Sequence, residues 1–490
     1  MLSPQTRCKQ VGSDGIREIM CPRSRLFATT IAVFFLALHI GVRAESVLAR
    51  IKIDPLQRFQ TIDGFGVNFN GTYFRNSQRP MIDLLVKDLG ATLFRIDPYG
   101  LTNWEAANDN DDANVMNWEY YNDRYSIPEF EAAWAAGRYL NSLDVRPYLT
   151  LSGIPPAWML NEDRSAPTFK TCSQDTKSHL NPQMYEEFAE TVVSLAVYAR
   201  NTAHVDFRYF GPLNETDCYP NEGPRVDPQE MPTLLNVIAK RLKKEGLGDV
   251  RIVAAEQAHM QNNYIEEILK SKELMPSIGA FSLHSYSDAN DATPHVRAVQ
   301  ESAYASIPVW LTEYGDLDDL NQSAENEWKG FSLAATKRAL RSINQGVTAA
   351  VFWDAFDNYH EHYPRMTYYG LFANHNHQYQ PKKRYYAAKQ LYHFVHVGAQ
   401  RISVEGPEGM LMSGFVNGDD ASVVVVGMRE AGAENITVSL PGYEGEWRIF
   451  QTTPRLDCEQ TGTAVIANGS AQVHLDKESI FTLLLSKQKK

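Results

Sequence analysis

Short apolar runs recur along the middle of the chain, each followed by a longer stretch with apolar residues at every third or fourth position. Runs of this length are typical of buried strands, and the spacing that follows them is typical of amphipathic helices. Eight runs fit this description, at residues 62–67, 92–96, 146–151, 207–213, 251–255, 280–284, 308–312 and 348–353. The clearest helical patterns lie at residues 81–89, 129–143, 182–201, 228–244 and 325–344. Alternation of strand and helix predicts a parallel sheet.

The number of strand–helix units decides which parallel fold is expected. Eight units favour a closed (β/α)8 TIM barrel over residues 61–397, and no GxGxxG follows the first run, which disfavours a dinucleotide-binding fold. Beyond residue 398 the chain changes to short strands joined by Gly, Asn and Asp turns, which predicts an antiparallel β-sandwich over residues 398–490. Residues 45–60 also alternate and have no place in the barrel, so we expect them to pair with the sandwich.

The N-terminal segment has the composition of an export signal. Arg23 and Arg25 precede an apolar run at residues 26–42, and Val42 and Ala44 supply the small residues of a cleavage site after Ala44. This order predicts a signal peptide over residues 1–44. Because the run is short for a membrane span, we expect a secreted protein, extracellular or periplasmic, with no membrane span after cleavage.

Composition narrows the expected partners. The apolar fraction is 43%, as in globular proteins, and the net charge is −12 before a basic leader is removed. An acidic protein is a poor partner for nucleic acid or anionic membranes. Cys172 and Cys218 follow neighbouring predicted strands, which allows a disulfide in an exported protein, whereas Cys458 has no evident partner. No Cys or His spacing indicates zinc, and we expect a monomer without metal or cofactor.

Carboxylates, hydrogen-bonding groups and aromatic residues gather where the predicted barrel strands end, which is where catalytic residues of such barrels lie. Aromatic faces and polar groups with few other side chains suit a neutral sugar. In strand order the candidates are Arg95 and Asp97, Trp158, Asn214 and Glu215, His284 and Tyr286, Glu313, and Trp353.

Two glutamates, Glu215 and Glu313, dominate this set because glycoside hydrolysis needs a pair of carboxyl groups on either side of the scissile bond. Glu313 is the candidate nucleophile, since Arg95 and Tyr286 can hold it ionised. Glu215 is then the acid/base, with Asn214 placed to bond the sugar 2-hydroxyl.

Other residues have supporting parts. Trp353 is expected to form the floor of the reacting subsite. Glu256 and Asp97 are expected to support the pair or to contact substrate. An aromatic segment follows the second strand, and it is either a polymer-binding surface or the packed core of a loop; its members are Trp104, Trp118, Tyr120, Tyr121 and Tyr125.

With Asn214-Glu215 on the fourth strand and Glu313 on the seventh, the chain resembles the clan of retaining (β/α)8 glycoside hydrolases, clan A. Within it the chain is most similar to glycoside hydrolase family 30, as a divergent branch. The resemblance is carried by FQTIDGFG at 59–66, PPAWM at 155–159 and the sandwich after the eighth helix. Thr216 follows the acid/base where the family usually has Pro, and TEYG at 312–315 also departs from its commoner forms.

These observations predict a secreted retaining β-glycosidase that hydrolyses a poly- or oligosaccharide by double displacement, with carbohydrate as its partner. Two alternatives stay open. One is a carbohydrate-binding barrel without catalysis, and the other is an exo-acting glycosidase on a small glycoside or glycolipid.

Overall fold

The computed structural model describes residues 49–98, 105–360, 365–432 and 434–486. The expected signal peptide at 1–44 lies outside these residues. Within them, no helix combines the length and apolar character needed to cross a membrane.

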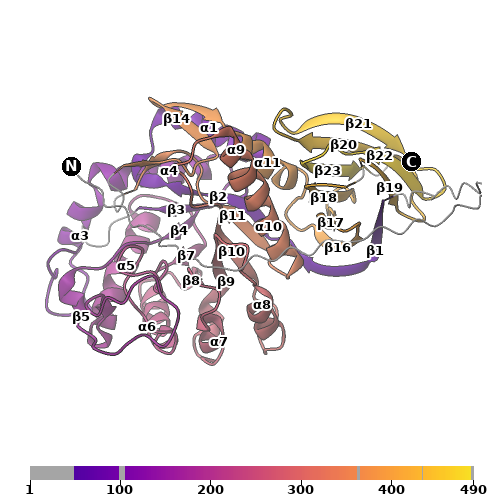
Figure 1. Ribbon diagram of the computed structural model, residues 1–490. Helices are drawn as coiled ribbons and strands as arrows, with labels where there is room; N and C mark the ends of the chain where they lie inside the picture. Colours follow the sequence, from indigo (N-terminus) through magenta and orange to yellow (C-terminus); the bar gives the residue numbers. More distant parts are fainter. Residues whose placement is uncertain (1–48, 99–104, 361–364, 433, 487–490) are drawn as a thin grey trace, which may run out of the picture. The chain divides into compact units, whose positions relative to one another are not determined.

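A closed barrel of eight parallel strands forms the first part of the fold (Figure 1), which confirms the expected barrel. Each strand overlaps one of the eight predicted runs. Around the barrel the order is β10 (Val309–Tyr314), β11 (Ala349–Phe352), β2 (Gly64–Asn70), β3 (Leu93–Asp97), β4 (Tyr148–Thr150), β7 (Tyr209–Gly211), β8 (Arg251–Gln257) and β9 (Ile278–Ser285).

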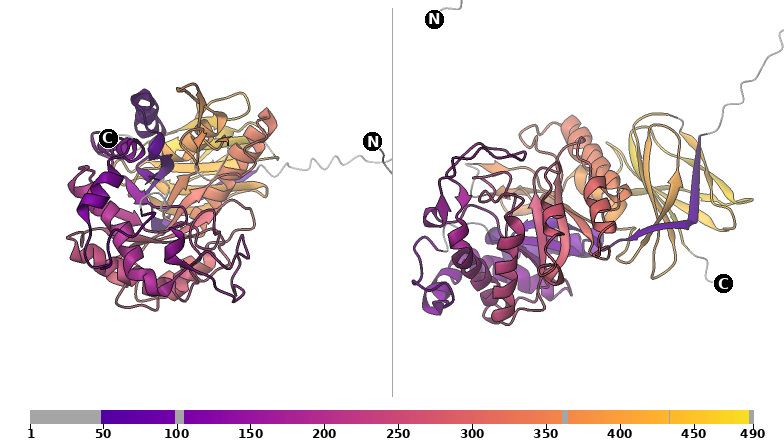
Figure 2. Two further views of the ribbon diagram at one scale, coloured as in Figure 1. Left: turned by 90° about the vertical axis from the view of Figure 1, so that its left-hand side faces the viewer. Right: turned by 90° about the horizontal axis from the view of Figure 1, so that it is seen from below.

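Helices surround the barrel strands, and their apolar faces form the main core. Figure 2 shows them around the strands from two further directions. They are α1 (Arg79–Leu84), α3 (Trp118–Tyr125), α4 (Pro128–Asn141), α5 (Tyr185–Asn201), α6 (Met231–Lys244), α7 (Tyr264–Ile268), α8 (Thr293–Gln300), α9 (Ala324–Asn326), α10 (Ala335–Asn344) and α11 (Lys383–Tyr392). Two π-helical turns continue α1 and α9, η3 (Leu85–Leu89) and η7 (Glu327–Ala334). Short 3-10 turns are η1 (Gly71–Tyr73), η2 (Asn76–Gln78), η4 (Ala157–Met159), η5 (Pro182–Met184) and η6 (Met275–Ser277).

The interior of the barrel is filled with side chains. Large and small residues from five of the strands make a separate cluster there, so the barrel is a packed core and not a pore. Its members are Tyr148, Val253, Ala280, Trp310 and Ala349. This packing leaves the carboxyl ends of the strands as the place for a site.

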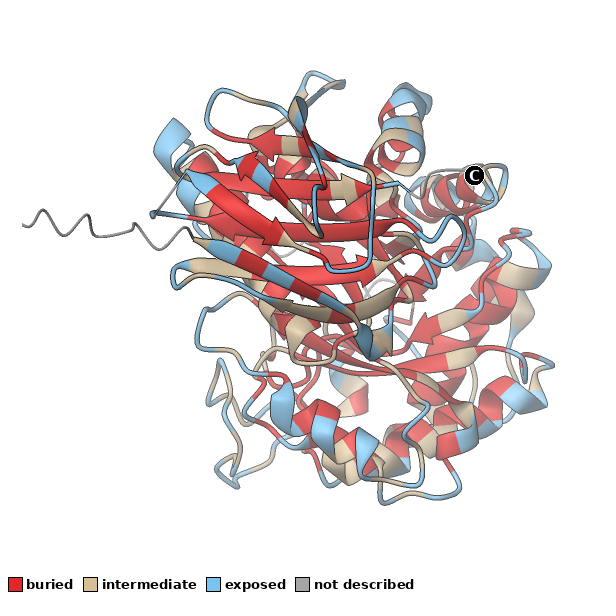
Figure 3. Cartoon of the chain, turned by 90° about the vertical axis from the view of Figure 1, so that its right-hand side faces the viewer, coloured by how far each residue is buried: buried red, intermediate tan, exposed pale blue. Residues whose placement is uncertain are grey.

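The C-terminal part is a nine-stranded β-structure with its own apolar core, as expected for the sandwich. Figure 3 shows many of its strand residues buried, with exposed and intermediate residues between them. The order is β21 (Glu459–Val465), β20 (Glu446–Thr452), β23 (Ser479–Leu485), β18 (Val423–Arg429), β17 (Met410–Val416), β16 (Gln400–Glu405), β1 (Arg50–Thr61), β19 (Asn435–Ser439) and β22 (Ser470–His474). The edge strands β21 and β22 contact each other, so the sheet folds back around its core.

The first described strand, β1, belongs to this sheet, as the sequence predicts. It pairs antiparallel with β16 and parallel with β19 (Figure 1). Hydrogen bonds also join the barrel helices to the sheet. Asn344 of α10 donates to the Met412 carbonyl at 2.9 Å, and Thr482 of β23 donates to the Gln390 carbonyl of α11 at 2.6 Å.

Three two-stranded sheets lie in the connections: β5 (Leu160–Asn161) with β6 (His179–Leu180), β12 (Asn358–Tyr359) with β13 (Met366–Thr367), and β14 (Phe372–His375) with β15 (Gln378–Pro381). The aromatic segment after the second barrel strand is partly helical, in α3. Its Tyr121 and Tyr125 are fully buried and stack 5.7 Å apart, so these two rings belong to the core and not to a binding surface. Trp104 lies outside the described residues.

Candidate active site

Six of the predicted residues meet in one hydrogen-bonded cluster at the carboxyl ends of the barrel strands. They are Arg95 on β3, Asn214 and Glu215 just after β7, His284 and Tyr286 at the end of β9, and Glu313 on β10. Parallel strands of a closed barrel all end on one face, which explains how residues from four strands converge.

Glu313 is held by donors from two strands. Arg95 Nη1 donates to its Oε1 at 2.6 Å, and the Tyr286 hydroxyl donates to its Oε2 at 2.6 Å. Arg95 is itself fixed because it also donates to Asn68 and Asn214, each at 2.8 Å. Burial raises the pKa of the Glu313 carboxyl above its usual value, and the positive charges of His284 and Arg95 offset only part of that rise.

Glu215 has a backbone φ of 39°, in the left-handed region that residues other than Gly seldom adopt. Backbone hydrogen bonds hold the turn that imposes this conformation. The Glu215 N–H donates to the Glu256 carbonyl at 2.8 Å, and the Cys218 N–H donates to the Glu215 carbonyl at 2.7 Å. These hydrogen bonds therefore hold Glu215 in a strained backbone conformation that fixes the direction of its carboxyl group.

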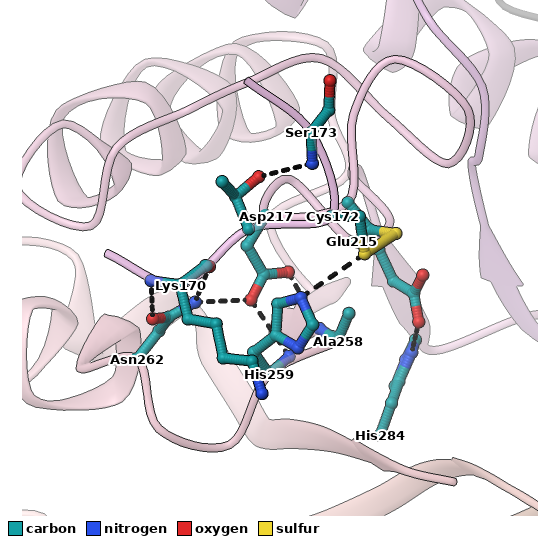
Figure 4. Close-up of a disulfide and its surroundings, with 11 residues drawn as sticks. Lys170, Cys172, Ser173, Glu215, Asp217, Ala258, His259, Asn262 and His284 are labelled. Atoms are coloured by element: carbon teal, nitrogen blue, oxygen red, sulfur yellow. Dashed lines mark hydrogen bonds and ion pairs between the residues drawn. A yellow bond between two sulfur atoms is a disulfide. The ribbon is translucent and has the colours of Figure 1, made fainter. Parts of the chain in front are cut away.

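Asp217 and a disulfide anchor the same turn from outside the site (Figure 4). The buried Asp217 carboxylate accepts hydrogen bonds from the backbone of Ala258 and His259 and from Asn262, at 2.9, 3.0 and 2.7 Å. Cys172 and Cys218 are joined, as the sequence allowed. Cys458 is free, and burial raises its pKa to about 12.

His284 lies between the two glutamates. Its Nδ1 is 2.6 Å from Oε1 of Glu215 and 3.4 Å from Oε2 of Glu313, and its Nε2 is 2.9 Å from Oε2 of Glu256. Burial lowers the pKa of His284, but the three carboxylates outweigh it and raise that pKa to about 10. Burial in turn raises the pKa of Glu215, opposed by the hydrogen bond from His284. The imidazole is therefore a cation that contacts both members of the pair.

The remaining candidates, Asp97, Trp158 and Trp353, lie at a strand end or in the segment that follows one, and they have other contacts. Asp97, at the end of β3, is buried and accepts a hydrogen bond from Ser152. Trp158 in η4 is half-buried and donates its indole N–H to the Glu105 carbonyl at 3.1 Å. Trp353 follows β11 and stacks on His360, with ring centres 5.1 Å apart.

Sequence reasoning underrated two deeply buried residues of the cluster, Glu256 and Asn68. Glu256 ranked only as a supporting residue, yet it accepts from Tyr148, Thr312 and His284. Asn68 was missed, although its place at the end of the first strand was a usable signal. Its Oδ1 accepts from Arg95, and its Nδ2 donates to the Thr312 and Phe352 carbonyls.

Two groups of side chains in the described part of the chain have metal-like spacing. In one of them, a ligand atom from each of Glu215, His284 and Glu313 lies within 4.8 Å of the others, but the imidazolium and Arg95 already neutralise these carboxylates. The other group is His179, Asp227 and Glu230. There the Arg225 guanidinium bonds Asp227 at 2.8 and 3.0 Å and supplies the positive charge.

Comparison with known proteins finds one similar family and several similar structures. Residues 185–347 match the family model of the glycosyl hydrolase catalytic core. This segment contains Glu215, His284 and Glu313. No curated protein sequence matches the chain.

Solved structures with the same fold include several glycoside hydrolases. A glycoside hydrolase family 30 subfamily 8 xylanase from Clostridium acetobutylicum superposes with a TM-score of 0.67 at 16% identity, covering 89% of this chain and 100% of the xylanase. A family 30 endoxylanase from Clostridium papyrosolvens gives 0.68 at 18% identity, with 89% and 100% covered. An endo-β-1,6-glucanase gives 0.65 at 17% identity, with 90% and 94% covered.

The chain therefore has the fold of these glycoside hydrolases, a (β/α)8 barrel with a C-terminal β-domain, and its residues 185–347 are similar to the glycosyl hydrolase catalytic core. Its structural neighbours include the family 30 xylanases and the glucanase, as the sequence resemblance predicts.

Proposed function

We propose that this protein is a secreted retaining β-glycosidase that hydrolyses a poly- or oligosaccharide by double displacement. One observation carries the proposal: a carboxylate oxygen of Glu215 and one of Glu313 lie within 4.8 Å of each other. Retaining enzymes have their carboxyl groups about 5–5.5 Å apart, whereas inverting enzymes need about 6.5–9.5 Å to admit a water.

In the first step Glu313 attacks the anomeric carbon while Glu215 gives its proton to the leaving oxygen, so the glycosidic C–O bond breaks as a glycosyl ester forms. Glu313 suits the ionised part because it accepts short hydrogen bonds from Arg95 and Tyr286. Burial raises the pKa of both carboxyls, but the Arg95 guanidinium that donates to Glu313 lowers the pKa of that carboxyl, so Glu215 suits the acid.

In the second step Glu215 takes a proton from water, and the remaining hydroxide attacks the anomeric carbon and releases Glu313. Asn214 would bond the sugar 2-hydroxyl, since Arg95 holds the carbonyl end of its amide at 2.8 Å. Trp353 would form the floor of the subsite, with its ring fixed by stacking on His360.

Xylans and β-1,6-glucans are the first substrates to test, because the structural neighbours are named for these chains. Export is supported by the predicted leader and by the Cys172–Cys218 disulfide, since disulfides persist in oxidising compartments.

A labelling experiment tests the mechanism. The protein is first screened on a glycan panel, and the 2-deoxy-2-fluoro glycoside that matches the cleaved glycone is then used as the probe. We expect peptide mass spectrometry to find the fluoro sugar on Glu313, no label on Glu313→Gln, and first-formed product with the substrate's anomeric configuration by NMR. First-formed product of inverted configuration would refute the retaining mechanism, and hydrolysis that persists in Glu313→Gln would place the chemistry elsewhere.

A further inference from the structure

A third carboxylate, Glu256, lies in the same cluster and has no part in the double displacement described above. It is fully buried, so it cannot meet substrate directly. Its position comes from a β-bulge: between Ala254 and Gln257, β8 has one residue more than the facing part of β9. Glu256 has a φ of 56° at this bulge. Bulges at barrel rims redirect side chains next to active sites.

Glu256 closes a ring of contacts with Glu215 and His284. Its backbone carbonyl accepts from the Glu215 N–H at 2.8 Å. Its side chain accepts from His284 Nε2 at 2.9 Å, and His284 Nδ1 donates to the Glu215 carboxylate at 2.6 Å. Glu256 thus contacts the backbone of the candidate acid Glu215 directly and its side chain through His284. Tyr148 and Thr312 also donate to Glu256, which fixes its rotamer.

Counting charges shows what the third carboxylate adds. The cluster contains three carboxyl groups and two cations, Arg95 and His284, with Arg95 Nε 3.4 Å from Glu256. Because net charge is costly in a buried site, the neutral arrangement is favoured. Two carboxylates are then ionised and the third keeps one proton. Charged and titratable groups that also act on the three carboxyls or on His284 are Tyr148, Asp217, Glu222, Tyr286 and Asp354.

We propose that Glu256 is a positioning residue that holds His284 as an imidazolium, with Nδ1–H directed at the catalytic pair, so that Glu215 and Glu313 share one proton. The inference rests on the function proposed above. Burial opposes ionisation of Glu256, but Arg95 and His284 outweigh it and lower its pKa, in accord with a permanent anion at this position.

The arrangement keeps the charge of the site constant during the reaction. Before the first step Glu256 and Glu313 are anions and Glu215 is protonated. When Glu215 gives up its proton and Glu313 becomes a neutral ester, the negative charge moves from one glutamate to the other. His284 Nδ1 is close to both, at 2.6 Å from Glu215 and 3.4 Å from Glu313, so one cation stabilises the carboxylate before and after the transfer.

Glu256→Gln tests the proposal, because it removes the charge and keeps the shape. The cluster then holds one excess positive charge and should lose a proton at lower pH. We expect the alkaline limb of kcat/KM against pH to move about 1–3 pH units toward acid. Glu256→Asp keeps the charge with a shorter reach, and we expect it to lower kcat with the alkaline limb in place. An unmoved limb in Glu256→Gln would overturn the proposal.

A second readout does not depend on activity. The protein is labelled with 15N at histidine, and the His284 resonance is assigned by its loss in His284→Asn. We expect this resonance to report a protonated imidazole through pH 9 in the wild type. In Glu256→Gln we expect it to titrate at lower pH. Titration of His284 at the same pH in both proteins would refute the role of Glu256. If the expected titration is seen without any glycan hydrolysis, the proposed function fails while the Glu256–His284 pairing stands.

Glu190→Gln is the control for removal of a buried carboxyl group, since burial raises the pKa of Glu190 to about 8 and the variant loses little charge near neutral pH. Glu190 is as fully buried as Glu256 and also contacts an arginine, Arg241 at 3.3 Å, but it lies on α5 outside the cluster. We expect this variant to keep the wild-type pH profile. A limb shift of the same size in the control would show a general effect of removing a buried carboxylate and would overturn the specific role.

Discussion

Replacement of both Cys172 and Cys218 by alanine separates the contribution of the disulfide to stability from the anchoring of the turn that carries Glu215. The disulfide closes a loop with a sequence separation of 46 residues, and Cys218 lies three residues after Glu215. The same turn is also held without sulfur, because the Cys172 N–H donates to the Asp217 carbonyl at 3.1 Å and the Cys218 N–H donates to the Glu215 carbonyl at 2.7 Å.

The expected loss of stability follows from the length of the loop. In the chain-entropy model, opening a loop of this size releases about 4 kcal/mol of unfolded-state entropy at 25 °C. With a urea slope of about 4 kcal/mol per molar for a large protein, the unfolding midpoint should fall by about 1 M. Removal of the reducible pair should also make the variant insensitive to dithiothreitol, whereas the wild type should lose a similar amount of stability on reduction.

Activity should change much less than stability. Asp217 keeps its hydrogen bonds to the Ala258 and His259 backbone and to Asn262, so the turn that carries Glu215 stays anchored. We expect kcat at a temperature well below unfolding to fall less than about tenfold, equivalent to 1.4 kcal/mol.

Cys458→Ala controls for the loss of a thiol, since Cys458 is free and lies outside the turn. Urea unfolding followed by circular dichroism measures stability, and initial rates on the cleaved glycan measure activity. An unchanged urea midpoint in the double variant would refute the loop-entropy reasoning. A folded double variant with kcat reduced a thousandfold would refute the assignment of the anchor to Asp217.

Three further predictions concern single positions. Tyr286→Phe removes a 2.6 Å hydrogen bond to Glu313, and since bonds to charged groups contribute about 1.5–3 kcal/mol, we expect kcat to fall about 10–150-fold with an unchanged circular dichroism spectrum; wild-type kcat would contradict this. Glu105 is fully buried, and burial raises its pKa to about 7. Its protonated form therefore stabilises the fold by about 3 kcal/mol below pH 4.5, and this stabilisation is lost as the pH rises to 7. Urea unfolding at pH 5 and pH 8 should therefore show a smaller difference for Glu105→Gln than for the wild type, and equal differences would count against the assignment. At Gly66 a Cβ atom would collide with the Leu93 backbone carbonyl, so Gly66→Ala should give no soluble protein, and a folded variant with wild-type thermal stability would disprove the close packing of β2 and β3.

Local pattern was sufficient for the architecture because each barrel strand is buried on both faces and reads as a short apolar run. It also located Glu313, which lies within β10, and Asn214, which follows β7, since strand ends could be recognised from the sequence. The alternating segment before residue 62 likewise predicted its pairing with the C-terminal sheet, where β1 is found.

The role of Glu256 could not be predicted in the same way. Its direction depends on an extra residue in β8 and on a φ of 56°, neither of which leaves a pattern in the local sequence. The burial of the aromatic segment that ends at Tyr125 could not be predicted from the sequence either. Whether a tyrosine faces solvent or the core depends on which helices it packs against, and here Tyr198 of α5 contacts Tyr125 edge to face at 5.3 Å.

The position of β1 inside the C-terminal sheet, between β16 and β19, has a consequence for how the chain is made. Its partners β16 and β19 begin at Gln400 and Asn435, more than 300 residues later. At a synthesis rate of about 5–20 residues per second, β1 waits some 20–80 s on the ribosome with both edges unpaired. The barrel helices and strands are all made within that interval, so the last step of folding joins the first described strand to strands made long after it. A β-module cut from this protein at the end of the barrel would therefore lack an interior strand of its sheet.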